Sequence, residues 1–216
     1  MASRTHRFQA PRGTRDFPPP EMAVRRHIEA AWREASTLHG FDEIEGPTFE
    51  HLELYTAKSG PGIVSELFSF TRAGGDTTYA LRAEFTPTLA RMVAAMGSAA
   101  PRPVKWFAVP CLFRAERPQR GRLREHVQWN VDLIGDPDPT AEAEVIATAV
   151  TALGRLGLGP ADVAFRVSHR GLVQSLLVSR CGVPEDRIEA ALHLLDRREK
   201  VPAEVFATQA AEVGLD

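Results

Sequence analysis

Apolar residues recur at three- and four-residue spacing early in this 216-residue chain. The pattern predicts an amphipathic helix over Glu21–His39, since apolar positions three and four apart share one helix face. Pro19 and Pro20 suit the start of that helix, and Gly40 follows where a C-terminal cap belongs. The positions that carry the pattern are Val24, Ile28, Trp32, Ala35 and Leu38.

The same spacing predicts further helices. One begins at Thr86 as N-cap with Pro87 at the first helical position, and Leu89, Met92, Val93 and Met96 form its apolar stripe. Another runs from Pro139-Thr140 to about Leu156. The remaining helices are expected near Arg170–Arg180, Pro184–Leu195 and Ala203–Val213.

Between the helices lie short β-branched and aromatic stretches that predict strands. Leu67–Phe70 and Thr77–Leu81 flank a turn-rich Ala73–Asp76 and predict a hairpin, while Val104–Phe113 and Val127–Ile134 predict two central strands. Shorter strands are expected at Phe41–Glu45, which stops at Gly46-Pro47, and at Val163–Val167. Helices separated by hairpins favour an α+β fold with a mainly antiparallel sheet over a βαβ arrangement.

Composition restricts the class of protein. Charged residues make up 25% and hydrophobic residues 44%, and the net charge is -2, which are ordinary values for one globular core with a small appendage. No apolar run reaches the ~20 residues of a membrane span, and the first residues lack the apolar core of an export signal. We therefore expect no membrane partner and a cytoplasmic protein, in which Cys111 and Cys181 are reduced thiols.

Positive charge is concentrated between the two central strands. The segment Phe113–Gln128 reads FRAERPQRGRLREHVQ and holds five arginines against two glutamates. Planar guanidinium groups gathered on one loop suit a polyphosphate, although a solvated basic loop or a nucleic-acid backbone site remains open. The chain has no G-x-x-x-x-G-K loop, so a nucleotide would have to be held by side chains.

Pairs of polar residues in register are candidate ligand groups. Arg114 and Glu116 are two apart on a predicted strand and so share a face, as do Gln128, Asn130 and Asp132. Glu84 and Thr86 stand two apart just before a helix, where both can converge on an ammonium group. The alternatives are that Arg114 and Glu116 pair with each other, and that Asp132 belongs to a buried ion pair.

The arginine-rich segment resembles the second signature motif of class II aminoacyl-tRNA synthetases, in the R-x-E-R-P-Q-x-G-R form typical of histidyl-tRNA synthetases. The helix, strand and Gly46-Pro47 resemble the first motif, which builds the dimer interface of that family. The arm PRGTRDFPPP resembles the family's R-G-x-x-D-x-x-P opening. The resemblance implies an α+β fold with an antiparallel sheet of six or seven strands flanked by helices, and a homodimer.

The resemblance also implies roles for site residues. The position of Arg114 bridges the α-phosphate of ATP and the amino-acid carboxylate, Arg122 reaches the terminal phosphates, and Glu116 reads the adenine amine. His126 stands where the family usually has an aromatic residue that stacks on adenine. The implied amino-acid pocket, for histidine, consists of Glu84, Thr86, Gln128 and Asp132. Mg²⁺ is expected with ATP, without assigned ligands. Arg117, Arg120 and Arg124 lie near the tRNA(His) acceptor end or in solvent.

The resemblance divides the chain into a catalytic core over residues 1–168, with the first two motifs, and the start of a helical insertion over residues 169–216. The third motif, the R-x-L-D-Y-Y stretch that selects histidine and an anticodon-binding domain are not in the sequence. We therefore expect the N-terminal part of a longer synthetase, inactive alone. Ala83 stands where the family usually has a proline in L-R-P-E.

Three functions fit these observations. The first is a histidine–tRNA ligase that forms histidyl-adenylate from histidine and ATP and passes the histidyl group to tRNA(His). The second is a synthetase-like regulatory subunit of ATP phosphoribosyltransferase, which senses histidine. The third is a class II-like protein that binds RNA or serves assembly through its first helix and basic hairpin.

Overall fold

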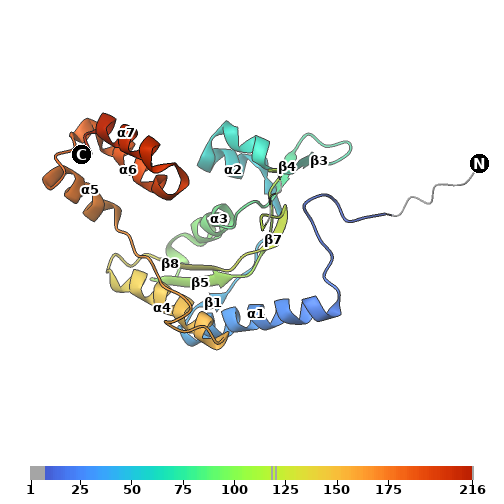
Figure 1. Cartoon of the computed structure of the whole chain (residues 1–216). Helices are drawn as coiled ribbons and strands as arrows, with labels where there is room; N and C mark the ends of the chain where they lie inside the picture. Colours follow the sequence, from blue (N-terminus) through green and yellow to red (C-terminus); the bar gives the residue numbers. More distant parts are fainter. Residues whose placement is uncertain (1–7, 118, 120, 216) are drawn as a thin grey trace, which may run out of the picture. The chain divides into compact units, whose positions relative to one another are not determined.

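A computed structural model describes residues 8–117, 119 and 121–215. The chain divides into two compact units, Met1–Gly159 and Pro160–Asp216, each of which is described by itself (Figure 1). Residues 160–169 lie outside helices and strands, and almost all of them are exposed. The domain boundary expected after residue 168 lies further along the chain than the division after Gly159. Among the described residues, no helix is long and apolar enough to cross a membrane.

The first unit alternates helices with short strands. Its α-helices are α1 (Pro19–Leu38), α2 (Leu52–Ser59), α3 (Thr86–Met96) and α4 (Thr140–Arg155). Its strands are β1 (Asp42–Glu43), β2 (Phe49–His51), β3 (Ser69–Thr71), β4 (Thr78–Leu81), β5 (Val104–Ala108), β6 (Cys111–Phe113), β7 (Glu125–Val127) and β8 (Asn130–Ile134). Short 3₁₀ turns cover Pro61–Glu66 and Gly97–Ala99.

A three-stranded sheet in the order β1-β5-β8 forms the centre of this unit. Alternate side chains of β5 point to opposite faces, as the pleat of a strand requires. Trp106 and Ala108 pack with Phe85 and Leu89 of the α3 region, whereas Lys105 reaches Glu144 of α4 and the His39 carbonyl at the end of α1. Helices therefore cover both faces, with α3 on one and α1 and α4 on the other (Figure 1).

The other strands form a second sheet, β2-β4-β3, and a separate ladder, β6–β7. Pairing is antiparallel throughout except between β1 and β5. The mainly antiparallel α+β fold is thus confirmed. The described strands lie in three small groups, however, where a single sheet of six or seven strands was expected.

Each predicted central strand is interrupted. The Val104–Phe113 stretch breaks at Val109-Pro110, and the Val127–Ile134 stretch breaks at Gln128-Trp129. Proline has no N–H to donate to a ladder, so β5 cannot continue through Pro110. The Gln128 N–H still donates to the Pro110 carbonyl at 3.0 Å, which keeps the two interruptions opposite each other.

Other differences from the sequence predictions are local. Phe85, not Thr86, is the N-cap of α3, and Thr86 is its first helical residue; proline is tolerated throughout the first helical turn, so Pro87 permits the helix to begin one residue earlier. The strand predicted at Val163–Val167 is not formed, since a strand needs a ladder partner and this segment has none among the described residues. The sequence pattern predicted neither α2 nor β2.

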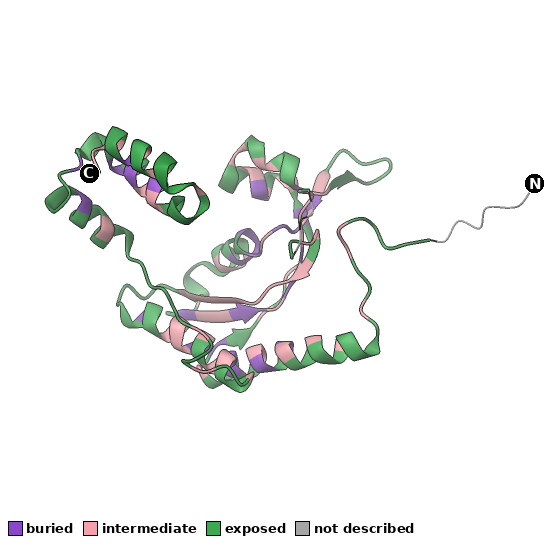
Figure 2. Ribbon diagram, viewed as in Figure 1, coloured by how far each residue is buried: buried purple, intermediate pink, exposed green. Residues whose placement is uncertain are grey.

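The second unit is helical. It consists of α5 (Arg170–Ser179), α6 (Ile188–Asp196) and α7 (Ala203–Val213), with 3₁₀ turns at Glu185–Arg187 and Arg198–Lys200. Its core contains Leu177, Val183, Ile188 and Ala191. His169 caps α5, because its Nδ1 accepts the Leu172 N–H at 3.1 Å. Figure 2 shows the buried and intermediate positions of these helices as short patches on mostly exposed ribbons.

Candidate functional site

Arg114 follows β6 directly and extends its ladder by one step. Its backbone N–H donates to the Arg124 carbonyl at 2.8 Å, and the next N–H, of Ala115, donates to the Glu66 carbonyl at 2.9 Å. The Nε–H of the Arg114 side chain reaches the Ala83 carbonyl at 3.5 Å, which is a long and weak contact. Glu116 lies in a bend beyond the strand, so the predicted shared face of a strand does not apply to Arg114 and Glu116.

Glu116 is paired with Arg122, with 2.7 Å between Oε2 and Nη2. The alternative in which Glu116 pairs with Arg114 is therefore wrong. The Arg122 side chain is 51% exposed and that of Glu116 is 30% exposed. An ion pair this open to solvent contributes at most about 1 kcal/mol, so a ligand can replace it without a large loss of stability.

His126 of β7 lies in the electrostatic field of this group. Burial lowers the pKa of its imidazole, and the positive charges of Arg114 and then Arg122 lower it further, against a hydrogen bond with Gln128 that raises it. Four residues predicted for the site are thus close enough to act on one another. The neutral form of the His126 ring is favoured, which suits stacking on a base.

Arg124 contacts other parts of the protein through both its backbone and its side chain. Its backbone N–H donates to the Gly13 carbonyl at 2.7 Å, and its side chain reaches the Glu116 carbonyl at 3.1 Å. Its guanidinium also lies 5.9 Å from the Phe68 ring centre. Arg124 therefore ties the N-terminal arm to the loop. Arg117 is exposed, and the expectation for Arg120 lies outside the described residues.

Glu84 lies between β4 and α3, and Thr86 is the first residue of α3. Thr86 is exposed, so its hydroxyl is open to solvent. The Glu84 carboxylate binds the ammonium group of Lys58 at the end of α2. The position predicted to bind a ligand ammonium is thus occupied by an ammonium of the chain itself.

Gln128 and Asp132 lie on either side of the start of β8. The Gln128 amide donates to Asn130 Oδ1 at 3.1 Å. Asp132 lies opposite Trp106 of β5, and burial raises the pKa of its carboxyl. Ion pairs found among the described residues do not include Asp132, so the buried-pair alternative has no support in this part of the chain. No contact found there ties Asp132 to Arg114.

Sequence patterns missed Lys58 and the buried Arg82. Both act across the fold, with Lys58 26 residues from Glu84 and the Arg82 guanidinium contacting residues 29–37 positions away. Periodicity within one segment carries no signal for such pairs. Only the charge of Arg82 at the end of an apolar strand could have indicated a buried partner.

One pocket lies beside this cluster. It measures about 300 Å³ and is lined by α1 between Glu21 and Trp32, by the arm and by the β6–β7 ladder, where Cys111 and His126 belong to its lining. Burial, and then Glu125, raise the pKa of the Cys111 thiol to about 11, so this cysteine is not a thiolate near neutral pH. Of the predicted site residues in the described part of the chain, His126 alone lines this mainly apolar pocket, which makes it a poor polyphosphate site.

The described residues contain no group of three or more histidine, cysteine or acidic side chains that could hold a metal ion. They therefore provide no all-protein magnesium cage. Mg²⁺ bound through phosphate oxygens needs only one or two carboxylates.

Comparisons with known proteins place the chain as a whole. A family model described as histidyl-tRNA synthetase matches residues 13–213. A chloroplastic/mitochondrial histidine–tRNA ligase of Arabidopsis thaliana is 42% identical over 205 residues, covering 95% of this chain and 42% of that protein. The histidine–tRNA ligase of Halobacterium salinarum is 44% identical over 204 residues, covering 94% of this chain and 46% of that protein. The chain thus spans less than half the length of these relatives.

Solved structures show the same fold. Histidyl-tRNA synthetase from Nostoc sp. PCC 7120 matches with a TM-score of 0.82 at 21% identity, over 97% of this chain and 46% of that chain. A protein from Bacillus halodurans C, described as an ATP phosphoribosyltransferase regulatory subunit/histidyl-tRNA synthetase, matches with a TM-score of 0.76 at 28% identity. That match covers 100% of this chain and 54% of the other.

Proposed function

This chain belongs to the histidyl-tRNA synthetase family, and on that premise we propose that it is the ATP- and histidine-binding part of a histidine–tRNA ligase. The carboxylate of histidine would attack the α-phosphorus of ATP, giving histidyl-adenylate and pyrophosphate. The histidyl group would then pass to the acceptor end of tRNA(His). The cluster of Arg114, Glu116, Arg122 and His126, coupled through an ion pair and through the lowered pKa of His126, carries the proposal.

In the proposed nucleotide half of the site, Arg114 offsets the charges of the attacking carboxylate and of the α-phosphate. Two anions must approach each other in this step, and a forked cation between them lowers the electrostatic barrier and holds an in-line geometry. Arg122 would give up its ion pair with Glu116 and bind the terminal phosphates. The Glu116 carboxylate would then accept a hydrogen bond from the adenine amine. The neutral His126 ring would stack on the base.

In the proposed amino-acid half, Glu84 and Thr86 receive the α-ammonium group of histidine. The Lys58–Glu84 pair supports this role, because it shows a cation of the same kind on the same carboxylate. Histidine would displace Lys58. Gln128 and Asp132 would bind the imidazole. Burial raises the pKa of the Asp132 carboxyl, and its oxygens can accept an imidazole N–H.

The partners proposed for the whole protein follow from the family. They are Mg²⁺ carried by the phosphates of ATP, tRNA(His), and a second copy of the protein docked through α1 and β1. We propose the cytoplasm as its location. These properties belong to the complete gene product.

The substitution Arg114→Ala tests the proposal. We expect histidine-dependent exchange of pyrophosphate into ATP by the natural gene product to fall by about 10²–10³-fold, because one preorganised charge on the reacting phosphate is lost. Unfolding in urea should not change, since the hydrogen bond found for the Arg114 side chain within the described part of the chain is weak. Arg72→Ala, at an exposed position of the β3–β4 turn, is the matched control and should keep full exchange. Full activity of Arg114→Ala would refute the assignment.

The likeness to the Bacillus halodurans protein supports one alternative, a histidine-sensing regulatory subunit of ATP phosphoribosyltransferase. That function predicts histidine binding without pyrophosphate exchange. A natural gene product that binds histidine, exchanges no pyrophosphate and stimulates a phosphoribosyltransferase would establish this alternative in place of the ligase.

A further inference from the structure

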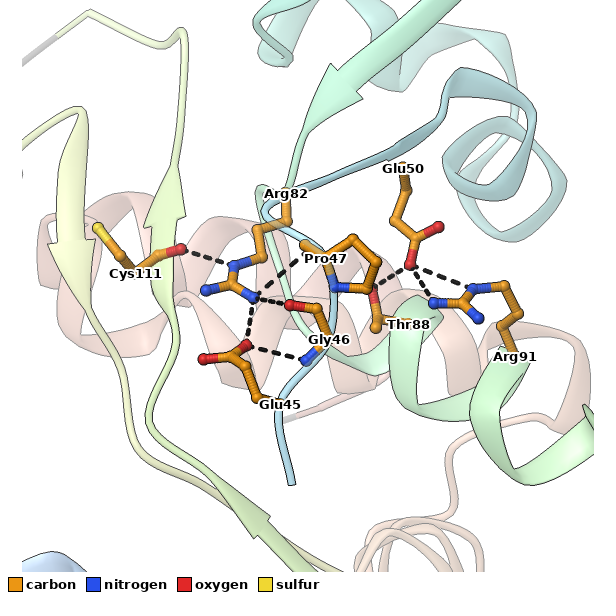
Figure 3. Close-up of polar contacts among 8 residues, drawn as sticks. All are labelled: Glu45, Gly46, Pro47, Glu50, Arg82, Thr88, Arg91 and Cys111. Carbon is orange, nitrogen blue, oxygen red and sulfur yellow. Dashed lines mark hydrogen bonds and ion pairs between the residues drawn. The ribbon is translucent and has the colours of Figure 1, made fainter. Parts of the chain in front are cut away.

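Arg82, at the end of β4, is a buried cation that joins three segments of the first unit (Figure 3). Its side chain is 5% exposed. The Nε–H donates to the Cys111 carbonyl of β6 at 2.9 Å. Nη1 reaches Glu45 Oε1 at 2.5 Å and the Gly46 carbonyl at 2.8 Å, both in the segment between β1 and β2. One guanidinium thus holds that segment and β6 in fixed relation to β4.

Backbone hydrogen bonds reinforce the same junction. The Arg82 N–H donates to the Thr48 carbonyl at 3.0 Å, and the Phe113 N–H donates to the Arg82 carbonyl at 2.8 Å. Arg82 is two residues before Glu84, and Phe113 is directly before Arg114. The proposed ammonium-binding carboxylate and the proposed phosphate-binding cation therefore extend from neighbouring points of one clamp.

A second arginine–glutamate pair anchors the same region from the other side (Figure 3). Glu50 is 7% exposed and accepts from Arg91 Nη2 at 2.6 Å and from the Thr88 hydroxyl at 3.2 Å. This pair fastens β2 to α3. Unlike Arg82, Arg91 makes no contact with β6 among the described residues.

We propose that Arg82 is a positioning residue that sets the distance between Glu84 and Arg114, and so the alignment of the amino acid with the α-phosphate. The inference rests on the proposed function. Arginine is suited to this role because the Nε and Nη1 of its planar fork reach Cys111 and the 45–46 segment from two fixed points, whereas lysine donates from one nitrogen on a flexible stem.

The experiment measures pyrophosphate exchange by the natural gene product at a temperature well below its unfolding midpoint. Arg82→Met keeps the bulk of the side chain and removes all its polar contacts. We expect kcat/KM for histidine to fall by about tenfold to a hundredfold, with KM raised and kcat lowered together, because small misplacements of reacting groups cost this much. Arg82→Lys, which can keep the Glu45 contact alone, should give values between those of Arg82→Met and the natural protein.

Arg91→Met is the matched control, since it removes an arginine–glutamate pair from the same region without touching β6. It should lower the urea midpoint while leaving KM and kcat unchanged. Equal kinetic effects of Arg82→Met and Arg91→Met would overturn the inference, because both would then act through stability alone. The inference would also be overturned if Arg82→Lys had the same KM and kcat as the natural protein, and this test holds even if Arg82→Met does not fold. An inactive natural protein would instead contradict the proposed function.

Discussion

Arg82 and Arg122 carry the same guanidinium group in opposite surroundings. The Arg82 side chain is 5% exposed and donates to groups in two other segments, so its charge is used within the fold. The Arg122 side chain is 51% exposed and holds a single carboxylate. A buried arginine with fixed partners stabilises and positions, while an exposed one remains available to a ligand.

His126 leads to a prediction about pH. Its pKa is lowered in the folded protein, so the unfolded chain binds more protons between that value and the ordinary one of about 6.5. Stability contributed by the neutral ring is therefore complete above about pH 6.5 and is lost as the pH falls toward the folded value. Because the ring is partly open to solvent, we expect a loss of about half a kcal/mol or less between about pH 7.5 and pH 5.5.

Urea unfolding of His126→Phe, followed at both pH values, checks this expectation. The phenylalanine variant should show a smaller decrease in unfolding free energy than the natural chain. His27→Gln, at an exposed position on α1, should show the natural decrease. The same pH dependence in all three proteins would rule out a lowered pKa at His126.

In the first unit, the segment between β1 and β2 approaches the start of α3 closely. Gly46, between β1 and β2, packs against the start of α3, where a Cβ atom would lie 2.4 Å from Thr88 Cγ2. Thr88 is fully buried and donates to Glu50, so it cannot move aside. A side chain at position 46 would therefore push the 45–50 segment away from α3 and away from Arg82.

We accordingly expect Gly46→Ala to lower the free energy of unfolding by about 1–3 kcal/mol, the usual cost of an extra methyl group in a packed interior. The urea midpoint gives the measurement. Gly75→Ala is the control, since its new Cβ would meet the Arg72 carbonyl oxygen at an ordinary 3.6 Å. Equal midpoints for the two variants would show that α3 yields to the added methyl group.

At the scale of the whole molecule, the two units have separate cores. Phe85, Leu89 and Ala108 belong to a core of the first, and Leu177, Val183 and Ile188 belong to that of the second. The three tryptophans, Trp32, Trp106 and Trp129, all lie in the first unit. Tryptophan fluorescence therefore reports on the first unit alone, whereas the circular dichroism of helices reports on both.

Leu177→Ala should destabilise the second unit by about 2–5 kcal/mol, because a nearly buried leucine leaves a cavity. We expect part of the helical signal to be lost at lower urea concentration, with the fluorescence midpoint unchanged. Leu89→Ala, an equivalent truncation in the first unit, should shift the fluorescence midpoint instead. A fluorescence shift in Leu177→Ala would mean that the two units unfold together.

Helix periodicity, hairpin punctuation and the arginine-rich segment were enough to predict α1, α3, α4, the helices of the second unit, the β3–β4 hairpin and the mainly antiparallel fold. These features depend on neighbours within a few residues, whose side chains share a face through the period of the helix or strand. The second-motif wording around Arg114 and Glu116 identified the family for the same reason, because it lies in one continuous segment.

Tertiary structure alone decided how distant residues are used. The Lys58–Glu84 pair and the contacts of Arg82 each depend on how separate segments pack. Val163–Val167 stays outside a strand, because strand formation requires a partner that sequence pattern does not supply. A linear pattern specifies which face a side chain occupies, but the group it meets there is fixed only when the chain has folded.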